Sequence, residues 1–137
     1  MQVCSSYQIL KPKTIMYNAL LLSPMIPSFD IKETVQFFKD VLSFSLVMDT
    51  ESYAICQKDN LTIHILRAGQ DIGQMEFYLQ VDSIDNLWAS IKNKLDGLKV
   101  KEPFNQEYGM REIHIGIPHT NALMFIGQEI KLIGEDE

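Results

Sequence analysis

The chain contains the same succession of strands and helix twice, and this repeat restricts its possible folds more than any other feature. Residues 19–67 predict a strand, an amphipathic helix and three short strands, and residues 75–128 predict the same order. Asp30 is placed to cap the first helix, and Asp82 or Ser83 is placed to cap the second. Because the order and the spacing agree, we predict an internal duplication of a βαβββ module.

The two predicted helices carry apolar residues at corresponding positions. When the first helix is shifted by 53 residues, Ile31 falls on Ile84 and Phe38 falls on Ile91. Any two amphipathic helices would match in part, so the shared order of elements is the stronger evidence for duplication. The apolar run at 19–27 predicts a buried first strand.

A single module of this kind cannot bury both faces of its sheet, because its one helix covers only one face. We therefore predict an α+β fold in which two βαβββ modules form an incompletely closed, barrel-like sheet around a groove, with the helices outside. Residues 16–130 are predicted to form this single domain. An N-terminal extension at 1–15 precedes it, and an acidic tail at 131–137 follows it. A functional site is expected on the groove face.

The composition is that of an ordinary globular protein, with 46% apolar and 22% charged residues in a chain of 137. The formal net charge of −6 argues against binding to nucleic acid, which requires a basic surface. No apolar run approaches the ~18 residues of a membrane-spanning helix, so no membrane partner is expected. Cys4 and Cys56 form no CxxC pair, and we expect free thiols in a cytoplasmic protein.

Four segments resemble, in the right order, motifs of the vicinal oxygen chelate superfamily, which includes glyoxalases, bleomycin resistance proteins and extradiol dioxygenases. Residues 37–44 (FFKDVLSF) resemble its FY-x-x-x-LGF segment, and residues 108–112 (YGMRE) resemble its YGMRE run. Residues 117–121 (IPHTN) stand where members commonly read DPDGN, and residues 76–85 look like the fifth strand and the entry to the second helix. The resemblance implies the fold, but the superfamily contains both enzymes and drug-binding proteins, so function must be judged from the site.

The resemblance also indicates where a metal ion would bind, because metal-binding relatives hold it on the first and last strands of each half. The corresponding residues here are Ser23, His64, Glu76 and Met124. Placing His64 on Met124 requires a shift of 60 residues, which we prefer to the shift of 61 that aligns the turn asparagines. Serine and methionine are poor ligands for hard divalent ions, and two remaining ligands are fewer than a catalytic site usually has. We therefore predict no metal and no cofactor.

Other candidate residues lie on the fifth strand and in the loop before the seventh. Glu76 and Tyr78 alternate on one strand face and could recognise a polar ligand, or simply face water or a dimer partner. Tyr108 could stack on a ligand, whereas Arg111 could bind a ligand or form a structural ion pair. Met25 and Met124 could form an apolar groove floor or belong to the core. The predicted ligand-binding residues are Ser23, Met25, His64, Glu76, Tyr78, Tyr108, Arg111 and Met124.

These observations favour a metal-free small-molecule-binding protein that resembles the bleomycin-resistance branch, with its ligand held in a groove of a homodimer. The alternative is a divalent-metal-dependent lyase, isomerase or dioxygenase that uses His64 and Glu76. A third possibility is an assembly module without a ligand. The sequence does not decide whether the protein catalyses a reaction.

Overall fold

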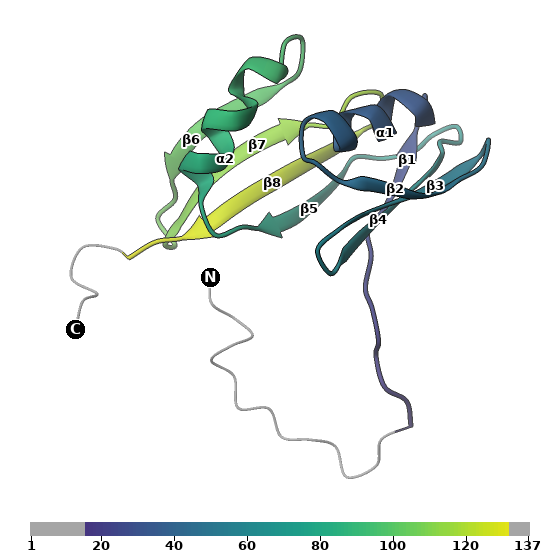
Figure 1. Cartoon of the computed structure of the whole chain (residues 1–137), viewed down its shortest axis with the longest axis horizontal. Helices are drawn as coiled ribbons and strands as arrows, with labels where there is room; N and C mark the ends of the chain where they lie inside the picture. The colour runs from purple at the N-terminus through teal and green to yellow at the C-terminus, as the bar shows by residue number, and fades with distance from the viewer. Residues whose placement is uncertain (1–15, 132–137) are drawn as a thin grey trace.

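The structure, a computed structural model, describes residues 16–131 and contains two βαβββ modules (Figure 1). The expectations for residues 1–15, including Cys4, and for the tail after residue 131 lie outside the described residues. The elements in chain order are β1 (Met25–Ser28), α1 (Ile31–Asp40), β2 (Ser45–Asp49), β3 (Tyr53–Lys58), β4 (Leu61–Arg67), β5 (Met75–Gln80), α2 (Ile84–Ile91), the 3-10 helix η1 (Lys92–Lys94), β6 (Val100–Asn105), β7 (Met110–Gly116) and β8 (Ala122–Glu129).

Each module forms one four-stranded sheet, and the two sheets have the same topology. The strand orders are β1-β4-β3-β2 and β5-β8-β7-β6. The first strand of each module pairs in parallel with the last, and the other pairs are antiparallel. The two sheets are not joined into a closed barrel. The predicted α+β fold of two βαβββ modules is therefore confirmed.

The first strand is shorter than the sequence pattern predicts. β1 starts at Met25, and residues 16–24 belong to no strand, although the Pro24 carbonyl still accepts a bond from the His64 N–H at 3.0 Å. Leu20 and Leu22 are 90% and 95% exposed, so the prediction of a buried strand over 19–27 is wrong for its first half. The physical reason is that β4, the strand that pairs with β1, begins at Leu61, which is opposite Leu22 in the register of this pair. Residues before Leu22 therefore have no strand beside them to pair with. Figure 1 shows this segment leaving the sheet below β1.

Both helices begin at the predicted caps. The Asp30 side chain accepts a hydrogen bond from the backbone N–H of Glu33 at 3.2 Å. The Ser83 hydroxyl accepts one from the backbone N–H of Asn86 at 3.2 Å, so Ser83 rather than Asp82 is the cap of α2. These bonds satisfy backbone donors that a helix start leaves unpaired.

The strand register decides how the two modules correspond. Met25 pairs with His64 in the first sheet, and Tyr78 pairs with Phe125 in the second. Tyr78 lies 53 residues after Met25, the same shift that aligns the helices, so Phe125 is the counterpart of His64. The separation of these counterparts is 61 residues, and the preferred shift of 60 is wrong.

This correction moves Met124 to the other face of its strand, because successive strand residues point to opposite faces. Met124 is 1% exposed and belongs to the hydrophobic core, as do Ile126 beside it and Ile84 of α2. We call the side of each sheet opposite its helix the helix-free face. The expectation that Met124 lies beside Glu76 on this face is therefore wrong, and the alternative that Met124 belongs to the core holds.

The first helix also joins the two modules. The Thr34 hydroxyl donates to the Pro118 carbonyl at 2.9 Å and lies 2.7 Å from the Ser28 hydroxyl. The Phe29 N–H donates to the His119 carbonyl at 2.8 Å. Thr34 and Ser28 are buried, so these bonds tie the start of α1 to the turn between β7 and β8.

Two further sequence expectations concern the cysteines and the membrane. Cys56 is a free, buried thiol, and burial raises its pKa, as expected for a structural rather than a reactive cysteine. Among residues 16–131, none of the helices has the length and apolar character needed to cross a membrane.

Candidate functional site

The helix-free face of the second sheet contains a buried carboxylate. Along β7, Ile113 and Ile115 point into the core under α2, so Glu112 and His114 point to the opposite face. Glu112 is nevertheless 0% exposed. A buried charge is tolerated only if hydrogen bonds replace the lost water.

Four side chains supply those hydrogen bonds. The Tyr108 and Tyr78 hydroxyls donate to Oε2 of Glu112 at 2.6 and 2.8 Å. Nε2 of His114 lies 2.9 Å from Oε1, and Nε2 of Gln106 donates to the same oxygen at 3.1 Å. We call these five residues the Glu112 cluster. Its members come from β5, β7 and the loop between β6 and β7.

The cluster shifts the pKa values of its members. Burial by itself raises the pKa of Glu112, but the bonds from Tyr108, His114, Tyr78 and Gln106 outweigh it, and the net pKa is below the ordinary value. Burial and the bond to Glu112 raise the pKa of Tyr108 to about 12, and they raise that of Tyr78 as well. At neutral pH the cluster therefore holds an ionised carboxylate and two neutral phenols.

A row of aromatic rings crosses all four strands of the same sheet. The centroids of Phe104 and His114 are 5.2 Å apart, those of His114 and Phe125 are 4.0 Å apart, and those of Phe125 and Tyr78 are 6.4 Å apart. We call these four residues the aromatic row. Nζ of Lys101 lies 4.1 Å from the Phe104 ring centroid and extends the row at its β6 end.

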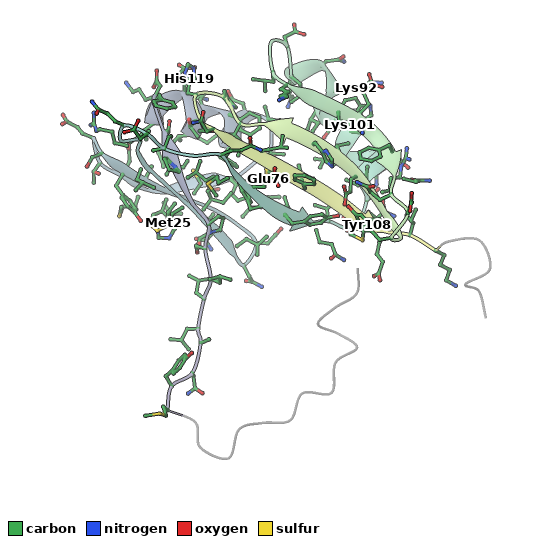
Figure 2. The ribbon with its side chains drawn as sticks, turned by 180° about the vertical axis from the view of Figure 1, so that it is seen from behind. Met25, Glu76, Lys92, Lys101, Tyr108 and His119 are labelled. Atoms are coloured by element: carbon green, nitrogen blue, oxygen red, sulfur yellow. The ribbon has the colours of Figure 1, made fainter. Side chains whose placement is uncertain are left out.

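The aromatic row and the Glu112 cluster share Tyr78 and His114. The carboxylate therefore orients two rings that a ligand could contact. Figure 2 shows Glu76 on this sheet and Tyr108 at the end where the chain leaves β8. The arrangement can present flat apolar surface and polar groups of fixed orientation to a small molecule.

The first sheet presents a different set of side chains on its helix-free face. The Tyr53 hydroxyl lies 2.7 Å from Nδ1 of His64, and their rings meet edge to face. The hydroxyls of Ser23 and Thr62 form a short hydrogen bond. Met25, which pairs with His64, is 48% exposed. Met25 and His64 are therefore neighbours, Ser23 lies close by on the same edge of the sheet, and both Ser23 and His64 already have side-chain partners.

The other predicted residues are placed as follows. Glu76 is exposed, and its Oε2 accepts a hydrogen bond from Nε2 of the neighbouring Gln74 at 2.9 Å. Arg111 points to the α2 side, where Nε lies 3.1 Å from Oδ1 of Asp85, and it also donates to Asn105 at 3.0 Å. Arg111 therefore forms a structural ion pair, one of the two alternatives, and its partner Asp85 lies in the first turn of α2. Tyr78 and Tyr108 both belong to the Glu112 cluster.

An apolar hollow of about 480 Å³ lies where residues of the two modules meet. Its lining includes Ser23 and Thr62 from the first module and Phe77, Tyr78 and Met124 from the second. Met124 thus borders a cavity, although it does so from the core side of its sheet.

The potential metal ligands of this face do not meet the needs of a divalent ion. Within the described part of the chain, no three His, Cys, Asp or Glu side chains lie together in a way that could hold a metal ion. By register, Thr62 and Leu123 are the neighbours of the first-strand positions Ser23 and Glu76. Hydroxyl and aliphatic groups at these positions do not fit a hard divalent ion.

Sequence reasoning missed Glu112, Gln106, Phe104 and Phe125 as site residues. One signal was available for the first of them. Glu112 and His114 alternate with Ile113 and Ile115, which places two polar side chains on one face of a strand whose other face is apolar. The loop residue Gln106 and the ring stacking gave no comparable local signal.

Comparison with known proteins supports the fold. No family model matches the chain, and no curated protein matches its sequence. An antibiotic-binding protein from Streptomyces sp. CB03234 has a TM-score of 0.69 at 15% identity, covering 84% of this chain and 99% of that one. The bleomycin-binding protein of Streptomyces verticillus, solved with copper(II)-bleomycin, has a TM-score of 0.68 at 17% identity, covering 85% and 100%. Lactoylglutathione lyase from Agrobacterium tumefaciens has a TM-score of 0.67 at 12% identity, covering 83% and 96%.

The chain therefore has the fold of the glyoxalase/bleomycin resistance/dioxygenase proteins, and the predicted resemblance is confirmed at the level of the fold. Among these similar structures are antibiotic-binding proteins and a lyase. The same fold is found in binding proteins and in an enzyme, so function must be inferred from the side chains of the site.

Proposed function

We propose that this protein binds a small organic molecule without a metal ion, and that the ligand lies on the helix-free face of the second sheet. The observation that supports this most is the Glu112 cluster, because an ionised carboxylate held by four donors is a costly feature that a simple packing surface does not need. The cluster fixes Tyr78 and His114 before any ligand arrives, and such preorganisation lowers the entropic cost of binding.

We further propose that a second copy of the chain completes the groove. Neither helix covers the helix-free faces, and large apolar side chains are exposed on them, among them Met25 at 48% and Tyr78 at 37%. Tyr17, Leu20 and Leu22 in the segment before β1 are more exposed still. A homodimer would cover this apolar surface and the open sheet edges.

A thermal-shift screen with a panel of antibiotics, bleomycin included, tests the binding proposal. A ligand that binds the folded state should raise Tm in a concentration-dependent way. Tyr78→Ala should reduce the shift, and Lys92→Ala on η1 should leave it unchanged as the matched control. A shift that Tyr78→Ala does not affect would contradict the proposed location.

Elemental analysis tests the metal-free part of the proposal. Protein produced in medium supplemented with zinc, iron and manganese should contain much less than one ion per chain after dialysis. One tightly held ion per chain would overturn this part and would favour a metal-dependent lyase, isomerase or dioxygenase instead.

A further inference from the structure

We propose that Nδ1 of His114 is the hydrogen-bond acceptor that selects the ligand, and that the ligand is a planar ring system with an N–H or O–H donor at its edge. This inference rests on the proposed function, since it names the ligand class for the same face. It concerns a residue that is not among the predicted ligand-binding residues.

The first step is the position of the proton on the imidazole. Glu112 accepts bonds from Tyr78, Tyr108 and Gln106 and is ionised at neutral pH, so its carboxylate has no proton to give. Nε2 of His114, 2.9 Å from Oε1, must therefore be the donor. In a neutral imidazole only one nitrogen carries a proton, so Nδ1 carries a lone pair.

The second step is access to that lone pair. No side chain or backbone group within residues 16–131 forms a hydrogen bond with Nδ1 of His114. In the same part of the chain, no fully buried side-chain nitrogen or oxygen lacks a partner. Nδ1 must therefore reach the surface, consistent with a His114 side chain that is 15% exposed. His64 differs, because its Nδ1 is already bonded to Tyr53.

The third step is the direction in which Nδ1 accepts. The ring centroids of Phe125 and His114 are 4.0 Å apart. The Phe104 ring is nearly perpendicular to the imidazole, with centroids 5.2 Å apart. These contacts and the bond to Glu112 fix the plane of the imidazole. The lone pair lies in that plane, so a ligand donor must approach along the edge of the ring.

The fourth step is the shape and charge of the partner. Tyr78 is 37% exposed and forms the other end of the aromatic row. Its ring plane lies 25° from that of Phe125, which packs on His114, so these two rings offer a nearly flat surface beside the acceptor. The buried negative charge of Glu112 disfavours an anionic group at this place. Neutral or cationic planar donors are therefore the class that fits.

Two NMR measurements test the inference with indole and 1-methylindole, which share a ring system but differ in the N–H donor. In ¹⁵N-histidine-labelled protein at pH 8, the His114 spectrum should show the tautomer with the proton on Nε2. Indole should shift the Nδ1 resonance of His114 and bind about three- to tenfold more tightly than 1-methylindole, the range expected for one added hydrogen bond.

The variant His114→Phe keeps a ring in the row and removes the acceptor. It should lose the preference for indole over 1-methylindole. His119→Asn, in an exposed turn, is the control and should keep the preference. Because His114→Phe also deprives Glu112 of a donor, its fold is checked by circular dichroism, and the tautomer of the wild type remains a test that needs no variant.

Several outcomes would overturn the inference. They are a proton on Nδ1, equal affinity for the two probes, a preference that survives in His114→Phe, or no change at Nδ1 with millimolar indole. If another ligand from the screen shifts Tyr78 and Phe125 but not His114, the inference fails and the proposed function stands. If no small molecule perturbs this face, both fail.

Discussion

Tyr78 and Gly127 fit together across the parallel pair β5 and β8. A Cβ atom on residue 127 would lie 1.8 Å from the Tyr78 hydroxyl oxygen and 2.7 Å from Cζ, so the absence of a side chain at Gly127 makes room for the phenol. The same hydroxyl donates to Glu112 at 2.8 Å. The glycine is therefore a requirement of the Glu112 cluster, although it forms no hydrogen bond to the carboxylate.

Gly127→Ala should displace the Tyr78 ring and break its bond to Glu112. We expect the free energy of unfolding to fall by about 1–3 kcal/mol, the usual range for overpacking. Gly73→Ala is the control, because a Cβ there meets no atom within 4 Å. Urea denaturation measures both variants. Equal stability of the two variants would show that Tyr78 does not occupy this position.

Glu112→Gln should destabilise the protein, because the amide retains the shape of the carboxylate but cannot accept four hydrogen bonds. The expected loss is about 1–3 kcal/mol in the free energy of unfolding. Glu76→Gln is the matched control, since this carboxylate lies on the same sheet and, among residues 16–131, is partnered only by the exposed Gln74. It should change stability by less than about 0.5 kcal/mol. The proposed role of Glu112 would be contradicted if the two variants were equally stable.

The free energy of unfolding should decrease at both acidic and alkaline pH. The folded pKa of Glu112 is lowered, so its stabilising contribution is present above the ordinary value of 4.5 and is lost as pH falls through the folded pKa. The pKa of Tyr108 is raised to about 12, so its neutral form is favoured by folding and stability decreases as pH rises from 10 towards 12.

Chemical denaturation at a series of pH values measures both limits. The stability difference between the wild type and Glu112→Gln should shrink below pH 4.5, where the carboxylate gains its proton. A difference that stays constant down to acid unfolding would contradict the lowered pKa of Glu112.

Thr34→Val should weaken the junction between the two modules. Thr34 is 0% exposed, and its hydroxyl donates to the Pro118 carbonyl and contacts the Ser28 hydroxyl. Valine has nearly the same shape but removes both interactions, and Ser28 keeps only the bond that it accepts from the Asp30 N–H. We expect a loss of about 1–3 kcal/mol. Thr34→Ser keeps the hydroxyl and should lose less. If serine were as destabilising as valine, the methyl group rather than the hydrogen bonds would stabilise the junction.

The sequence by itself determined the elements and their duplication. Helix caps, apolar periodicity and turn residues act within a few positions of one another, so they can be recognised along the chain. Asp30 and Ser83 cap the helices as the local pattern indicates, and β7 is recognisable from its alternating residues. The motifs that resemble the vicinal oxygen chelate superfamily were sufficient to predict the fold.

Only the tertiary structure decided which residues share a face and form the site. The pairing of Tyr78 with Phe125 joins residues 47 positions apart, and a change of one residue in that register moves Met124 from the helix-free face into the core. The Glu112 cluster likewise collects donors from two strands and a loop. Such contacts depend on backbone pairing between distant segments, which local patterns do not specify.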